Sequence, residues 1–202
     1  GLAVYDREKG LQVVKAKGRL QVLRDLTDGG AKVPGTMGLG HTRWATHGAP
    51  NDENAHPQVS QSGRIAVVHN GIIENYGELK SFLEAKGVVF TSETDTEVVA
   101  QLLEFYYAGD LLDAVFKVLH RIEGAYALGI VCADEPDKLI AVRDSFGIRP
   151  LVLGKSLDDT LIASETCAID AVGGTVVRDV KPGEVVVIDS QGEHSHFLNT
   201  IP

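Results

Sequence analysis

The order of the periodic segments predicts an α+β domain in which helices cover antiparallel sheets. Runs typical of strands gather at both ends of the 202-residue chain, and segments with helical periodicity stand between them. Strand and helix do not alternate as a parallel sheet requires, and the chain contains neither a G-x-G-x-x-G nor a Walker pattern. No stretch has the composition of a linker, so we expect a single compact domain.

The first quarter of the chain predicts a strand hairpin, a short helix and a third strand. Residues 2–5 and 11–15 are rich in β-forming side chains, and the D-R-E-K-G between them suits a hairpin loop. Helical spacing over residues 18–26 predicts the short helix, and residues 37–44 predict the strand. Residues 44–63 are polar and lack periodicity, which predicts a long loop.

The rest of the chain predicts a strand, three helices and then a series of short strands. Residues 65–68 form a compact apolar run, and apolar side chains at helical spacing follow over residues 79–85, 98–106 and 111–122. The spacing of apolar side chains then changes to that of short strands, which one short helix at residues 165–171 interrupts. Strands are expected at residues 125–132, 138–142, 151–153, 160–163, 175–177 and 184–188.

Composition and charge exclude several classes of function. The net charge of −9, without a Lys/Arg cluster, would repel phosphate backbones and anionic lipid, so we expect neither nucleic acid nor membrane as a partner. No stretch is apolar enough to span a bilayer and the start lacks the order of a signal peptide, which predicts a cytoplasmic protein. Cys132 and Cys167 match no disulfide framework or zinc spacing, and we expect both to be buried.

The first motif with chemical potential is H-T-R-W-A-T-H-G at residues 41–48. The guanidinium fork of Arg43 suits a carboxylate, which makes this residue a candidate anchor for a small acidic molecule. Trp44 offers an aromatic wall, and Thr46 and His47 lie on a segment that could close over a ligand. The alternative is a surface arginine, a half-buried tryptophan and a turn, and composition does not decide between the two interpretations.

The second motif is V-V-H-N-G-I-I at residues 67–73, in which an Asn-Gly pair ends a predicted buried strand. The side-chain amide of Asn70 and the backbone N–H of Gly71 could converge into an oxyanion hole. An Asn-Gly pair is also a common hairpin turn, but a helical pattern follows in place of a returning strand, which disfavours the turn.

The third motif is S-E-T-D-T-E-V-V at residues 92–99, where a helix is predicted to begin. Thr94 and Glu97 match a capping box, and capping alone explains that pair. It leaves Asp95 unexplained, and we expect its carboxylate to face the ammonium group of a ligand.

Histidines gather in the same part of the chain, at His41, His47, His56 and His69. Their spacings match no familiar pair of metal ligands and no predicted helix carries them, so we expect no metal site. No pattern in the chain calls for a cofactor either.

Taken together, these motifs and N-A-H-P at residues 54–57 resemble class II glutamine amidotransferases, in particular the glutaminase domain of the glucosamine-6-phosphate synthase family. The resemblance covers nearly the whole chain. It implies the N-terminal-nucleophile hydrolase fold, a four-layer αββα sandwich of two antiparallel sheets between helical layers.

The resemblance also implies roles for individual residues. Arg43 would hold the α-carboxylate of L-glutamine and Asp95 its α-ammonium group, while Asn70 and Gly71 would form the oxyanion hole. The loop that covers glutamine would contain Thr46 and His47 with Trp44 beside them, and His56 would lie near the pocket.

The implied reaction begins with an N-terminal cysteine, whose thiolate attacks the glutamine side-chain amide with its own α-amino group as base. A γ-glutamyl thioester and ammonia form, and water then releases glutamate. Residues 1–202 contain no such cysteine, so we expect the glutaminase domain to be truncated before Gly1 and the chain alone to be inactive. Internal Cys132 and Cys167 lack a free α-amino group and cannot substitute.

The resemblance further implies a C-terminal acceptor domain, which would use the ammonia to make glucosamine 6-phosphate from fructose 6-phosphate, and assembly as a homo-oligomer. The last third of the chain differs, because residues 141–154, A-V-R-D-S-F-G-I-R-P-L-V-L-G, are similar to amidophosphoribosyltransferases. That family is the alternative. A second alternative is a catalytically silent module that only binds glutamine.

Overall fold

A computed structural model of the chain describes residues 1–44, 48–157 and 159–198. Its largest element is a six-stranded antiparallel sheet with the strand order β12-β11-β7-β6-β5-β4. The strands are β4 (Gln58–Val59), β5 (Ile65–Ile73), β6 (Gly124–Cys132), β7 (Leu139–Arg143), β11 (Glu184–Asp189) and β12 (Gly192–Phe197).

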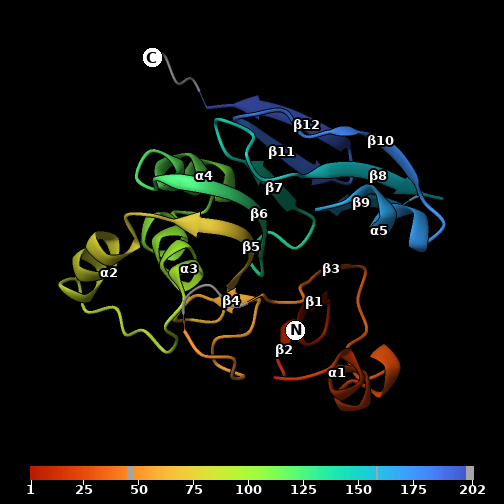
Figure 1. Cartoon of the computed structure of the whole chain (residues 1–202), viewed down its shortest axis with the longest axis horizontal. Coiled ribbons are helices and arrows are strands. Elements are labelled where there is room, and N and C mark those ends of the chain that lie inside the picture. Colours follow the sequence, from red (N-terminus) through yellow and green to blue (C-terminus); the bar gives the residue numbers. More distant parts are fainter. Residues whose placement is uncertain (45–47, 158, 199–202) are drawn as a thin grey trace.

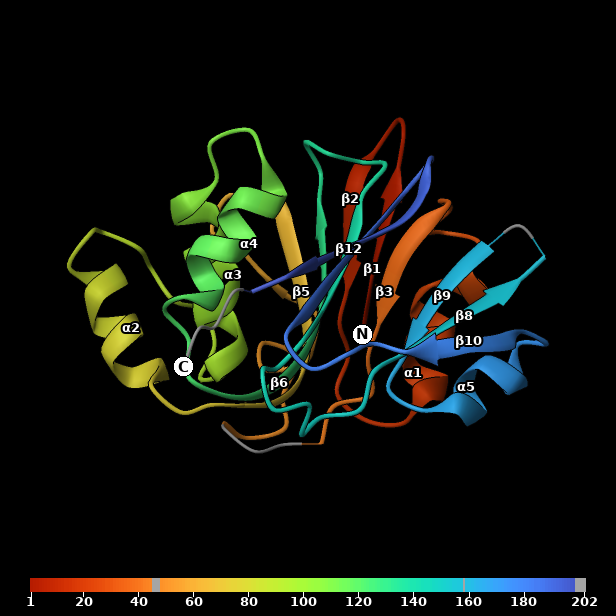
Figure 2. The same ribbon diagram turned by 90° about the horizontal axis from the view of Figure 1, so that it is seen from above.

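Two three-stranded antiparallel sheets form a second layer against one face of the large sheet (Figure 2). The first has the order β2-β1-β3, and the second has the order β10-β8-β9. These strands are β1 (Leu2–Asp6), β2 (Gly10–Val14), β3 (Met37–Gly40), β8 (Val152–Ser156), β9 (Asp159–Ala163) and β10 (Thr175–Asp179).

Helices cover both outer sides of these layers (Figure 1 and Figure 2). Three of them, α2 (Tyr76–Glu84), α3 (Asp95–Tyr106) and α4 (Leu111–Leu119), lie on the free face of the large sheet. Two short helices, α1 (Leu20–Leu26) and α5 (Thr166–Ala171), lie on the opposite side with a 3-10 turn, η1 (Asp28–Gly30). The predicted α+β sandwich is thereby confirmed, with its second sheet layer divided into two sheets.

Apolar side chains fill the spaces between the layers. The main core lies between the large sheet and helices α2, α3 and α4. Two smaller clusters join the sheets: Leu39 and Ala3 pack with Ala66 of β5, and Leu153 packs with Ala141 of β7. Successive side chains of strand β5 point to opposite faces of the large sheet. Val67 therefore belongs to the main core, while Ala66 belongs to the cluster between the sheets.

The structure corrects several expected boundaries. Strand β5 continues to Ile73 and β3 ends at Gly40, and the short β4 lies within the predicted loop. Strand β12 was not expected, because its sequence G-E-H-S-H-F is polar; it pairs with β11 at the edge of the sheet, where backbone hydrogen bonds suffice. Cys167 is exposed, not buried, because the side of α5 that faces the protein carries Ile169.

Among the described residues, no helix has the length and apolar character needed to cross a bilayer.

Candidate functional site

A cavity of about 340 Å³ lies where the segment after β3, strand β5 and the start of α3 meet. Most of the predicted site residues line it, although they come from four separate motifs of the sequence. These residues are Arg43, Trp44, His56, Asn70, Gly71 and Asp95. The other two predicted residues, Thr46 and His47, lie outside the described residues.

Asn70 and Gly71 lie inside strand β5, opposite Ala127 and Tyr126 of β6. The Asn-Gly pair is therefore neither a hairpin turn nor the end of the strand. Gly71 has φ +141°, and a Cβ atom there would lie 1.9 Å from the carbonyl oxygen of Ala125, so only glycine fits. The pair is part of a continuous sheet, which holds hydrogen-bond donors rigidly in place.

Asp95 is the first residue of α3 and is only 3% exposed. Its Oδ2 accepts a hydrogen bond of 2.8 Å from the backbone N–H of Ile73, and the His69 Nδ1 lies 3.9 Å away. The structure thus fixes an anion in the cavity wall beside the predicted oxyanion hole.

The expected capping box is present only in part. The Thr94 Oγ1 accepts from the backbone N–H of Glu97, as predicted. The Glu97 carboxylate does not return to Thr94, because it accepts instead from the backbone N–H groups of Thr91 and Ser92, at 2.9 and 2.6 Å. Glu97 therefore fixes the turn that precedes the helix, and with it the place of Asp95.

Arg43 supplies the opposite charge on the same cavity wall. Its guanidinium donates to the carbonyl oxygen of Gly48 at 3.2 Å. Burial lowers the pKa of Arg43, while the Asp95 carboxylate raises it, as expected for opposite charges that line one cavity. Trp44 lines the rim and is 90% exposed, more than the half-buried position considered from the sequence.

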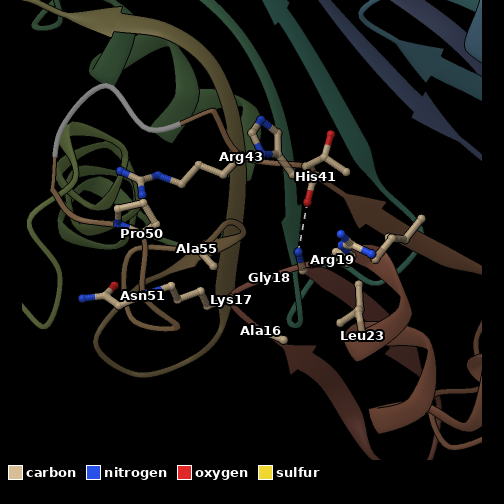
Figure 3. A pocket seen from close by; sticks show the side chains of 13 residues that line it. Ala16, Lys17, Gly18, Arg19, Leu23, His41, Arg43, Pro50, Asn51 and Ala55 are labelled. Carbon is tan, nitrogen blue, oxygen red and sulfur yellow. Dashed lines mark hydrogen bonds between the residues drawn. The ribbon is translucent and has the colours of Figure 1, made fainter.

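A smaller cavity of about 180 Å³ adjoins the first, and His41, Thr42 and Arg43 line both. Figure 3 shows this second cavity, with the Arg43 side chain extending toward Pro50. The segment that carries Arg43 is therefore accessible from two sides.

Three histidines form the floor of the larger cavity, and the motifs had singled out only His56 for the site. The rings of His41 and His56 stack at 4.4 Å between centroids. The Thr96 hydroxyl lies 2.9 Å from the His69 Nδ1 and 3.3 Å from the His56 Nε2. Burial, with neighbouring His41 and His69, lowers the pKa of His56 to about 2.

His41 contacts the predicted oxyanion hole directly, since its Nε2 lies 2.7 Å from the Asn70 Oδ1. Its place in the first motif and that of His69 beside Asn70 are sequence signals that could have identified both. Within the described ranges, no group of His, Cys, Asp and Glu side chains is arranged to hold a metal ion.

The last third of the chain contributes Arg149, Ser164 and Glu165 to the cavity, and none of these was predicted. The loop that carries Arg149 is folded around the fully buried Asp144. The Asp144 carboxylate accepts from the backbone N–H groups of Phe146, Ile148 and Arg149, at 3.0 to 3.2 Å. The segment that resembles amidophosphoribosyltransferases thus contains a compact loop at one wall of the cavity.

This fold is that of N-terminal-nucleophile amidotransferases. The sequence profile of the glutamine amidotransferase domain matches residues 3–196. The chain belongs to this family.

Similar proteins include the glutamine–fructose-6-phosphate aminotransferase (isomerizing) of Caldanaerobacter subterraneus subsp. tengcongensis, which is 57% identical over 169 residues, covering 84% of this chain and 27% of that protein. The protein of the same name from Clostridium acetobutylicum is 48% identical over 195 residues, covering 95% of this chain and 31% of that protein. The chain therefore spans about a third of these relatives or less.

Among solved structures, glutamine phosphoribosylpyrophosphate amidotransferase from B. subtilis, complexed with ADP and GMP, superposes with a TM-score of 0.84. It is 34% identical, and the match covers 98% of this chain and 42% of that one. The relatives by sequence and those by structure thus represent the two amidotransferase families that the motifs resemble.

Proposed function

We propose that the larger cavity binds L-glutamine and that this domain releases ammonia from its side-chain amide within a longer protein. The observation that carries the proposal is the placement of Arg43, Asp95 and the Asn70–Gly71 pair around one cavity. A free amino acid presents a carboxylate and an ammonium group on one carbon. The Arg43 guanidinium suits the first, and the Asp95 carboxylate suits the second.

The Asn70–Gly71 pair would then face the other end of the ligand. When a nucleophile adds to the side-chain amide of glutamine, the carbonyl oxygen becomes negatively charged. The Asn70 side-chain amide and the Gly71 backbone N–H would stabilise that oxyanion from a rigid strand, where donors need no reorganisation during the reaction.

The nucleophile of the proposed reaction is an N-terminal cysteine outside residues 1–202. Among the described residues no cysteine lines the cavity: Cys132 is buried in β6 and Cys167 lies on α5. The thiolate would attack the amide carbon, the C–N bond would break with departure of ammonia, and water would release glutamate from the thioester. Thr46 and His47 are proposed to cover the bound glutamine, with Trp44 at the rim.

For the acceptor of the ammonia we propose fructose 6-phosphate, used by a C-terminal domain to form glucosamine 6-phosphate. The name and the 57% identity of the Caldanaerobacter relative support this choice. Phosphoribosyl pyrophosphate is the second candidate, because the B. subtilis structure is 34% identical over nearly the whole chain. Assembly as a homo-oligomer and a cytoplasmic location belong to the same proposal.

Calorimetric titration of this chain with L-glutamine tests the binding step. We expect Arg43→Ala and Asp95→Asn each to weaken binding by about tenfold or more, because each substitution removes one charge-assisted contact with the ligand. Arg43→Lys should recover only part of the affinity, because lysine lacks the guanidinium fork. Arg24→Ala, at an exposed position of α1, is the matched control. Undiminished binding by Arg43→Ala would reject the assignment.

Turnover is tested in the complete natural chain, by the release of glutamate and ammonia from glutamine. Hydrolysis with an N-terminal cysteine present, and its loss on substitution of that cysteine, are the expected results. Binding without hydrolysis would support the alternative of a silent glutamine-binding module.

A further inference from the structure

The hydrogen bond between His41 and Asn70 joins the two sheet layers at the cavity. His41 follows β3 of a three-stranded sheet, and Asn70 belongs to β5 of the large sheet. Their side chains meet with the His41 Nε2 at 2.7 Å from the Asn70 Oδ1. The same short segment carries Arg43, so this contact also sets the distance between the proposed carboxylate anchor and the proposed oxyanion hole.

The direction of this hydrogen bond determines which way the Asn70 amide faces. A carboxamide has one acceptor oxygen and one NH₂ group, and only a protonated imidazole nitrogen can donate to the oxygen. With the His41 Nε2–H donating to Oδ1, the amide cannot rotate by 180° without losing that bond. The Asn70 Nδ2 is then left as the donor for a ligand, as an oxyanion hole requires.

The surroundings of His41 favour the neutral imidazole, and the arrangement then needs the single ring proton to be on Nε2. Burial lowers the pKa of His41, the hydrogen bond to Asn70 opposes this change, and the nearby Arg43 cation lowers the pKa further. The ring is also fixed in orientation, because it stacks on the His56 ring at 4.4 Å.

We propose that His41 is a positioning residue, which donates from Nε2 to the Asn70 Oδ1 and thereby directs the Asn70 NH₂ group toward the oxyanion of the reacting amide. The inference rests on the proposed glutaminase function, since Asn70 needs this orientation only if an oxyanion forms in the cavity. His41 itself would act through Asn70 and not on the reacting atoms.

The main test is steady-state hydrolysis of glutamine by variants of the complete natural chain. Loss of an oxyanion donor lowers kcat by about 100- to 1,000-fold, which is the effect expected for Asn70→Ala. His41→Leu should lower kcat by about 10- to 100-fold, with KM within about twofold, because the donor stays but is misdirected. His41→Gln keeps an N–H donor and should recover much of the loss. His194→Leu on β12 is the control, with kcat unchanged.

A double-mutant cycle separates positioning from a general structural effect. If His41 acts through Asn70, His41→Leu should cost nothing further in the Asn70→Ala background. Multiplied losses in the double variant, or wild-type kcat for His41→Leu, would overturn the proposal while leaving the glutaminase function intact. Absence of hydrolysis by the unsubstituted chain would instead reject the proposed function.

A measurement by NMR spectroscopy requires no substitution, so it tests the proposal even if the His41→Leu variant does not fold. In protein labelled with ¹⁵N-histidine, the ¹⁵N chemical shifts report the tautomer of each imidazole ring. We expect His41 to be neutral and protonated at Nε2; protonation at Nδ1 alone would contradict the proposal, because Nε2 could then only accept.

Discussion

At the scale of single residues, Gly71 shows that the cavity wall requires glycine at this one position. A side chain at this position would meet the carbonyl oxygen of Ala125 at 1.9 Å, and its φ of +141° disfavours any other residue. We predict that Gly71→Ala costs at least about 3 kcal/mol of unfolding free energy, because backbone on the neighbouring strand would have to move.

Gly77 provides the matched control for this substitution. It lies within α2, and no atom stands within 4 Å of the place that an added Cβ would occupy. Gly77→Ala should be neutral or stabilising by about 0.5–1 kcal/mol, because alanine is the better helix former. Urea denaturation of both variants measures the difference, and equal stabilities would contradict the steric argument.

The buried His56 predicts a dependence of stability on pH. Its pKa is about 2 in the folded protein, mainly because of burial, against an ordinary value of 6.5. Below pH 6.5 the unfolded chain binds a proton that the folded chain does not, so stability falls with the pH until about pH 2.

Between pH 7 and pH 5, His56 is expected to lower the free energy of unfolding by about 2 kcal/mol. The lowered pKa of His41 reduces the free energy of unfolding further. Urea unfolding at the two pH values measures it. The variant His56→Gln should lose that part of the slope; an unchanged slope would mean that the pKa of His56 does not differ between the folded and the unfolded chain.

Most of the predicted site residues do line the cavity, because their motifs carry a chemical pattern. Arg43, Asn70 and Asp95 stand out in short polar runs beside apolar strands or helices, and their roles toward glutamine remain predictions. The contact between Thr96 and His69 could not be predicted, because a hydroxyl and an imidazole become partners only when α3 packs over β5. Sequence spacing does not report such a contact.

At the scale of elements, the start of α3 holds Asp95 in the cavity wall. The buried Thr94 Oγ1 accepts from Glu97 N and lies 2.9 Å from the Ser92 hydroxyl. We predict that Thr94→Ala costs about 1 kcal/mol, typical for loss of an N-cap. Thr175→Ala, at an exposed position of β10, should stay within about 0.5 kcal/mol of wild type. Equal costs in thermal unfolding would show that the cap contributes nothing.

Element type was predicted better than element ends. The apolar stripes of α3 and α4 and the continuous apolar run of β6 are strong local signals. The continuation of β5 through Asn70 and Gly71 has no local signal, because this pair usually favours a turn. Pairing with nine residues of β6 overrides that preference.

At the scale of the whole molecule, the cavity exists only where the layers meet. Arg43 follows β3 of one small sheet, Asn70 belongs to the large sheet and Asp95 to the helical layer, while Ser164 follows β9 of the other small sheet. The layers could be predicted from the order of strands and helices, but the division of the second layer into two sheets could not, since it depends on which distant strands pair.

This arrangement predicts that the small sheet of β8, β9 and β10 unfolds together with the rest of the domain. Leu153 of β8 is fully buried against Ala141 and Val186 of the large sheet. Leu153→Ala should therefore cost about 3 kcal/mol, as the loss of a buried leucine side chain commonly does. Leu20→Ala, at a position of α1 that is 67% exposed, should cost less than about 0.5 kcal/mol.

The two variants are compared by far-UV circular dichroism and by amide hydrogen exchange during denaturation. One cooperative transition is expected for Leu153→Ala, with exchange in β8 and β6 accelerated by the same free energy, because the cluster around Leu153 couples the sheets. If β8 exchanged at lower denaturant while β6 stayed protected, the small sheet would be a separate unit. The cavity wall at Ser164 and Glu165 could then open without unfolding of the segments that carry Arg43 and Asp95.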